Sequence, residues 1–168
     1  MLESILGFSQ ATGIYAFMNT PWGWPLAESI HFIGLCLLIG TVGVFDLRLL
    51  GMASGLAYAD LHKLVRLGVA GYFLNVVTGV MFFTTAPDQY LFNPAFQTKL
   101  FFMLIAGVNM LVFYTTTSAE VKGTSAMLVV PVRARAIAAI SLACWCAVII
   151  GGRLITYYRP PYYWCAWC

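Results

Sequence analysis

Apolar residues run along this chain in four long stretches, and the charged residues lie mostly between them or near their ends. The stretches cover residues 25–45, 64–84, 96–116 and 135–157. A helix that crosses a bilayer needs about 20 mainly apolar residues, and each stretch meets that requirement. Since the connections are too short to form another domain, the pattern predicts an all-α membrane protein with a four-transmembrane-helix bundle over residues 25–158.

The first 24 residues follow a different pattern, in which apolar positions alternate with small polar ones at roughly helical spacing. They contain no lysine or arginine, so they do not resemble a cleaved signal peptide. We expect residues 1–24 to form an amphipathic interfacial helix that lies along the membrane surface and is broken by Pro21 and Gly23. Trp22 and Trp24 then mark the headgroup level before the first span.

Composition supports this class of protein. Of the 168 residues, 61% are hydrophobic and 9% are charged, whereas about a quarter of the residues in a soluble domain are charged. The formal net charge is only +3, and the sequence contains no basic cluster. These features exclude an ordinary soluble domain, argue against nucleic-acid binding and make the lipid bilayer the first expected partner.

Lysine and arginine are unevenly distributed over the two sides of the predicted bundle. One side carries Arg48, Lys63, Arg66, Lys122, Arg133 and Arg135. The other side carries Lys99, Arg153 and Arg159. Because basic residues collect on the cytoplasmic side, this predicts a multi-pass protein of a bacterial inner membrane with both termini in the periplasm. The first span then ends at the inner surface, where Asp46 and Arg48 partly neutralise each other.

Glu28 and His31 place an acid and an imidazole one helical turn apart inside an apolar stretch. Ionisable side chains at membrane depth are costly and mark functional sites by default. Lys99 and Arg153 enter the bundle from the same outer side, and at ~1.5 Å per residue all of these groups lie within roughly 10 Å of the boundary. We therefore expect these residues to form one site. The alternative is that the two basic side chains extend to lipid headgroups.

An imidazole with cations at the same depth suits haem b, whose iron takes an axial histidine. In this interpretation His31 is the metal ligand, and the cations hold the haem propionates. The second axial position is vacant, is filled by Met81 or Met103, or is filled by a neighbouring copy in a homo-oligomer. His62 is excluded as a ligand to the same iron, because it lies about 20 Å away at the inner end of the bundle.

A quinone is the alternative cofactor, because a histidine beside a carboxylate can accept and relay the protons of a quinol. A di-iron site is disfavoured, since it needs a second Glu-x-x-His motif and further glutamates. A structural role for His31 stays open. A small transporter is a third class, although the sequence shows no inverted repeat or broken helix. These arguments favour an electron-transfer subunit over a stand-alone enzyme, with a non-catalytic structural or assembly subunit of a larger membrane complex as the alternative.

The C-terminal segment, residues 159–168, is aromatic, contains two prolines and ends in Cys-x-x-Cys. If it is periplasmic, a disulfide between Cys165 and Cys168 is chemically allowed. A thioredoxin-type redox motif needs a βαβ setting that this chain lacks. Aromatic side chains are common anchors at protein interfaces, so we expect the tail to contact the membrane surface or another subunit of a complex.

Several motifs point to a known family: WPLxESxHxxG at 24–34, FDLRLLG at 45–51, NPAFxxK at 93–99 and GRLI at 152–155. They resemble those of an uncharacterised family of small four-helix bacterial inner-membrane proteins. The likeness covers about residues 24–157 and leaves out the aromatic tail. A looser similarity to cytochrome b-like and copper-resistance membrane proteins implies a haem-binding role by analogy. The resemblance implies no particular activity.

Overall fold

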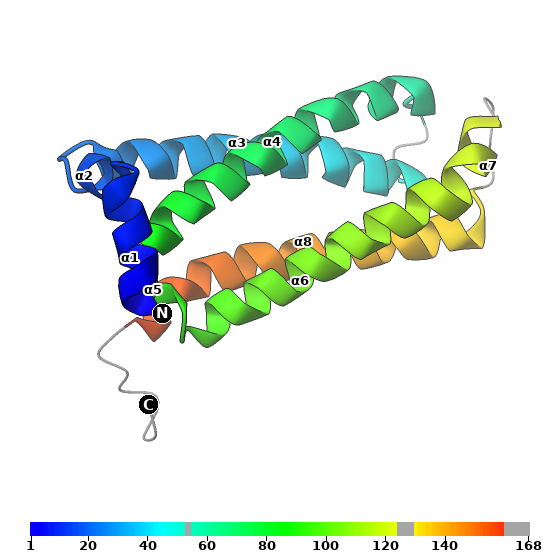
Figure 1. The fold of residues 1–168 in the computed structure, drawn as a ribbon. Helices are drawn as coiled ribbons and strands as arrows, with labels where there is room; N and C mark the ends of the chain where they lie inside the picture. Colours follow the sequence, from blue (N-terminus) through cyan, green and yellow to red (C-terminus); the bar gives the residue numbers. More distant parts are fainter. Residues whose placement is uncertain (53–54, 124–129, 160–168) are drawn as a thin grey trace.

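The computed structural model describes the chain except for residues 53–54, 124–129 and 160–168, and the described residues form helices without any strand. The long helices are α3 (Gly23–Leu49), α4 (Tyr58–Thr85), α6 (Pro94–Val112) and α8 (Val132–Leu154). They run the length of the molecule (Figure 1). A π-helical turn, η1 (Phe113–Thr117), joins α6 to α7 (Ser118–Gly123). A 3-10 turn, η2 (Ile155–Tyr158), follows α8.

Four helices in the described residues are long and apolar enough to cross a membrane, as predicted. They cover Gly23–Leu49, Asp60–Thr85, Pro94–Thr117 and Val132–Tyr158. Each predicted span lies inside an observed one, and the helices extend a few residues beyond the apolar stretches at both ends. A helix satisfies its own backbone hydrogen bonds, so it continues past the point where its side chains become polar.

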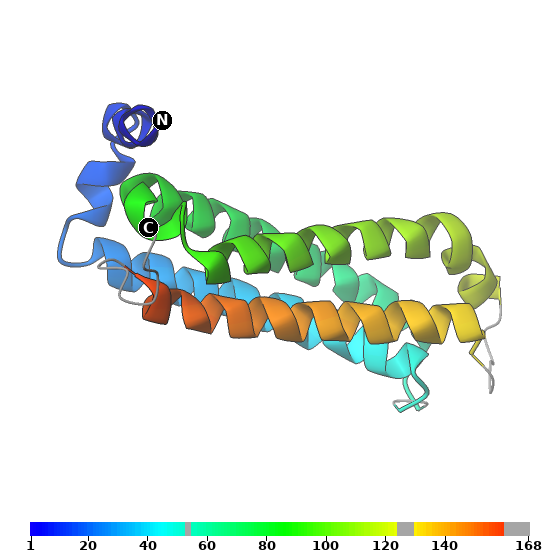
Figure 2. The ribbon, with the colours of Figure 1, turned by 90° about the horizontal axis from the view of Figure 1, so that it is seen from below.

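The bundle consists of two helix pairs. α3 packs mainly on α4, and α6 packs mainly on α8, while a smaller contact between α3 and α8 joins the pairs (Figures 1 and 2). The N-terminal helix, Leu2–Ala11, and the 3-10 turn η2 lie at the same end of the bundle (Figure 1). We name this end the outer end and the opposite one the inner end, after the predicted orientation.

Glycines bring α3 and α4 into backbone contact. A Cβ atom placed on Gly71 would lie 2.5 Å from the carbonyl oxygen of Gly34, and one placed on Gly34 would lie 2.8 Å from the carbonyl oxygen of Gly71. Any larger residue at either position would push the helices apart. Small residues at such a crossing let helices approach closely in a membrane, where van der Waals packing drives their association.

Two short helices, α1 (Leu2–Ala11) and α2 (Ile14–Met18), lie across the outer end of the bundle (Figures 1 and 2). Gly13 joins them with a φ of 75°, a left-handed conformation that favours glycine. The side chain of Met18 is 0% exposed, so the segment is packed down rather than detached. The N-terminal segment is thus helical, but it is interrupted twice, at residues 12–13 and at residues 19–22, and Gly23 already belongs to α3. Its placement in the membrane interface stays a prediction.

Asn93 ties the outer ends of α6 and α8 together. Its Oδ1 accepts hydrogen bonds from the backbone N–H groups of Ala95 (3.1 Å) and Phe96 (3.3 Å), which caps the start of α6. Its Nδ2 donates to the carbonyl oxygens of Ile155 (3.0 Å) and Tyr158 (3.2 Å) in η2. The side chain is 0% exposed. One buried amide therefore sets the register of α6 against the end of α8.

Candidate functional site

His31 lies on α3 in the outer part of the bundle, and a side chain of α4 orients its ring. Its Nδ1 is 2.7 Å from Oγ1 of Thr78, and that hydroxyl also lies 2.7 Å from the carbonyl oxygen of Leu74, to which it donates. A hydroxyl has a single hydrogen, so with that hydrogen on Leu74 the Nδ1–H of His31 is the donor to Thr78. In this arrangement the neutral imidazole keeps the lone pair of Nε2 for another partner.

Two aromatic rings stand beside the imidazole. The ring of Phe82, one turn beyond Thr78 on α4, meets the His31 ring edge-on at a centroid distance of 5.7 Å. Phe82 in turn stacks on Trp24 at 5.2 Å. Together these rings form an apolar wall on the outer side of His31. Such a wall limits the access of water and fixes the orientation of the imidazole.

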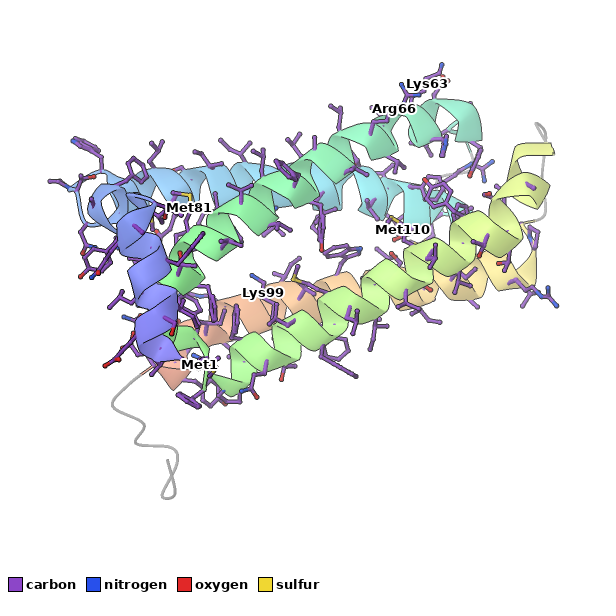
Figure 3. The ribbon with its side chains drawn as sticks, in the orientation of Figure 1. Met1, Lys63, Arg66, Met81, Lys99 and Met110 are labelled. Carbon is purple, nitrogen blue, oxygen red and sulfur yellow. The ribbon has the colours of Figure 1, made fainter. Side chains whose placement is uncertain are left out.

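Lys99 belongs to the opposite helix pair and faces the same region. Its stem lies over the glycine pair of α8, since a Cβ placed on Gly151 would be 3.3 Å from Lys99 Cβ and one on Gly152 would be 3.8 Å from Nζ. The side chain lies on the side of α6 that faces α3 and α4 (Figure 3). Its charge is within electrostatic range of His31. Within the described part of the chain, Lys99 forms no ion pair.

The two other predicted site residues lie elsewhere. Glu28 is exposed and lines a separate cavity at the outer end, and no hydrogen bond joins it to His31, which contacts Thr78 instead. Arg153 is exposed on α8. Of the predicted group, the structure therefore brings His31 and Lys99 into one region. The role of Glu28 and Arg153 in a shared site stays a prediction.

The predicted second haem ligands differ in their positions. Met103 follows Lys99 by four residues, so it lies one turn deeper on the same face of α6, and it is half-buried. Met81 is half-buried on α4 and lies close to the start of α3 (Figure 3). His62 precedes Thr78 by 16 residues on α4, which places it roughly 24 Å from the site. Its ring stacks on Tyr58 at 6.0 Å at the inner end.

Two polar features of the bundle were missed by sequence reasoning. Thr78 is the hydrogen-bond partner of His31, and no motif in the sequence marks it as such. Asp46 was expected at the inner surface, where it and Arg48 would partly neutralise each other. This prediction is wrong, because Arg48 is not the partner of Asp46. Asp46 is 4% exposed and lies beside Ser141 of α8, its Oδ2 has no hydrogen-bond partner within the described residues, and Nε of Arg48 donates to the carbonyl oxygen of Leu56 at 2.8 Å. An Asp-x-Arg pair on a helix points its side chains in different directions, which hydropathy alone does not register.

The predicted disulfide between Cys165 and Cys168 lies outside the described residues. Cys36, Cys144 and Cys146, which lie inside the spans, are free thiols. Cys144 is buried and packs as a small apolar side chain, whereas Cys36 and Cys146 are exposed.

Comparison with known proteins gives one result. No curated protein and no solved structure matches the chain. A model of a family of unknown function, DUF6644, matches residues 4–158, which includes all four spans and both His31 and Lys99. This agrees with the resemblance to an uncharacterised family and leaves the likeness to cytochrome b untested. The chain therefore belongs to the family of unknown function DUF6644.

Proposed function

We propose that this protein is a membrane electron-transfer subunit and that Nε2 of His31 binds the head group of a quinone near the outer face. The observation that carries the proposal is the hydrogen bond between His31 and Thr78. It gives the imidazole a defined orientation and favours the tautomer with an unprotonated Nε2. A histidine that is held in this way is ready to accept a proton.

The charges around His31 suit a quinol. A bound quinone would supply redox chemistry coupled to proton transfer, and Nε2 of His31 would accept a hydrogen bond from one hydroxyl group of its reduced form. The ammonium of Lys99 supplies a charge-assisted donor for an oxygen of the head group from the opposite helix pair. Thr78 holds the imidazole, and the Trp24–Phe82 wall separates it from bulk water. A quinone needs these hydrogen-bonding groups and no second imidazole.

Haem b is the second candidate, and the position of Met103 supports it. A metal-binding histidine usually donates its other ring N–H to a neighbouring group, as His31 does to Thr78 in this arrangement. Met103 lies on the face of α6 that carries Lys99, so a thioether and a cation approach the site from one helix. When bound through Nε2, haem would supply one-electron redox chemistry, and Lys99 would pair with a propionate.

The test is an oxidised and a dithionite-reduced absorption spectrum of gently purified protein, together with analysis of the quinone that it retains. His31→Ala is compared with His62→Ala, which removes the other histidine at the opposite end. Retained quinone that is lost only in His31→Ala supports the proposal. A reduced α-band that is lost only in His31→Ala assigns haem b instead. If neither cofactor is retained, or if both variants behave alike, the electron-transfer proposal fails and the structural or assembly subunit is favoured.

A further inference from the structure

A second cavity region at the outer end plays no part in the chemistry of His31. It has a volume of about 530 Å³ and lies among α2, the start of α3, the connection through α5 (Pro87–Tyr90) and the residue after η2. Sites for small ligands commonly measure about 300–1,000 Å³, so the cavity is large enough for one. Its charged and aromatic lining consists of Tyr15, Trp24, Glu28, Asp88 and Arg159.

The lining combines both signs of charge. Glu28 and Asp88 contribute carboxylates, and Arg159 contributes a guanidinium. Tyr90 follows this lining segment on α5, between Asp88 and the start of α6. Burial raises the pKa of the Tyr90 hydroxyl, so this group stays neutral at physiological pH and adds no charge of its own. A cavity lined by carboxylates and by a guanidinium suits a zwitterion better than a simple ion.

The depth of the cavity indicates where such a zwitterion would come from. The lining residues flank the ends of three spans, since α3 begins at Gly23, α4 ends at Thr85 and the last span ends at Tyr158. Trp22, beside the cavity-lining Trp24, is 77% exposed. Exposed tryptophans at the ends of spans mark the level of lipid headgroups. The cavity therefore opens where phospholipid phosphates lie.

We propose that this cavity binds the phosphoethanolamine head group of a zwitterionic membrane phospholipid. Arg159 binds the phosphate, because a guanidinium donates paired hydrogen bonds to phosphate oxygens. Glu28 and Asp88 accept hydrogen bonds from the primary ammonium, which also lies close to the ring of Trp24. A choline group has no N–H to donate to the carboxylates. An anionic glycerol head group offers them no cation. The inference is independent of the cofactor proposed for His31.

The experiment measures lipid retention by the full-length chain purified in detergent, with mass spectrometry of the intact protein–lipid complex. The lipids are phosphatidylethanolamine, phosphatidylcholine and phosphatidylglycerol with identical acyl chains. We expect phosphatidylethanolamine to be retained preferentially. Each of Arg159→Gln and Glu28→Gln should reduce this retention about tenfold, the effect of losing one charge-assisted hydrogen bond. Arg159→Lys should restore part of it.

Arg153→Gln is the matched control, because it removes an exposed arginine from the same end of the bundle without touching the cavity. Equal losses in Arg153→Gln and Arg159→Gln would overturn the proposal, as would equal retention of all three lipids. Soluble phosphoethanolamine carries the same charges. If it displaces the lipid at a similar concentration, the site takes a soluble zwitterion and the lipid assignment is wrong. Circular dichroism of each variant establishes that the helices are intact.

Discussion

Replacing Asn93 by alanine tests the largest contribution that one polar side chain makes to the outer end of the bundle. The substitution removes the cap of α6, which costs about 1 kcal/mol. It also leaves the buried carbonyl oxygen of Ile155 without its donor, which adds about 1–3 kcal/mol. We therefore expect Asn93→Ala to lower the free energy of unfolding by about 2–4 kcal/mol.

Asn93→Asp separates the two contributions. The aspartate keeps an oxygen for the N–H groups of Ala95 and Phe96, but it cannot donate to the carbonyls of η2. It should therefore lose about 1–3 kcal/mol through the missing donor alone. Asn19→Ala is the control, because the amide of Asn19 donates to Tyr15 at an exposed helix end, and we expect a change within about 0.5 kcal/mol.

The free energy of unfolding is measured by denaturant titration in detergent micelles, with helical circular dichroism as the signal. A loss for Asn93→Ala no larger than that of Asn19→Ala would refute the reasoning. Full stability in Asn93→Asp would show that the cap alone matters. In that case the link between α6 and α8 would contribute nothing, and the position of Lys99 over the α8 glycines would need another explanation.

Three further substitutions test other parts of the bundle. Gly71→Ala places a methyl group 2.5 Å from a backbone oxygen of α3, so it should lower the free energy of unfolding by about 1–3 kcal/mol in the same titration. Gly79→Ala is its control and should leave the stability unchanged, because a Cβ there would meet nothing within 4 Å. Thr78→Val removes the hydroxyl group that orients the imidazole and should reduce cofactor retention by the protein about tenfold. Thr78→Ser keeps a hydroxyl group and should retain the cofactor as well as the unchanged protein does. Equal retention in the two variants would contradict the role of the hydroxyl group. Ser141→Ala removes the hydroxyl group beside the buried carboxyl group of Asp46 and should lower the free energy of unfolding by about 1–3 kcal/mol. An unchanged value would show that this hydroxyl group does not stabilise the carboxyl group.

The sequence predicted the spans well because a bilayer imposes one simple requirement, an apolar length. It singled out His31, Lys99, Glu28 and Arg153 as candidates because ionisable groups inside a span stand out. It did not predict which of them meet. The contact of His31 with Thr78 joins positions 47 residues apart, and it depends on the register that the glycine contact sets between α3 and α4. The rotation of each helix about its own axis could not be predicted either, because every face of a membrane span is apolar. For that reason Asp46 was predicted beside Arg48 rather than facing α8.

The glycine contact between α3 and α4 also has a mechanical consequence. His31 lies three residues from Gly34 and Asp46 lies twelve residues from it on the other side, which corresponds to about 4.5 Å and about 18 Å along the helix. If the angle between the two helices changes about this contact, the backbone at Asp46 moves about four times as far as the backbone at His31. The imidazole therefore lies close to the glycine contact, where a change in the crossing angle of the two helices displaces it least.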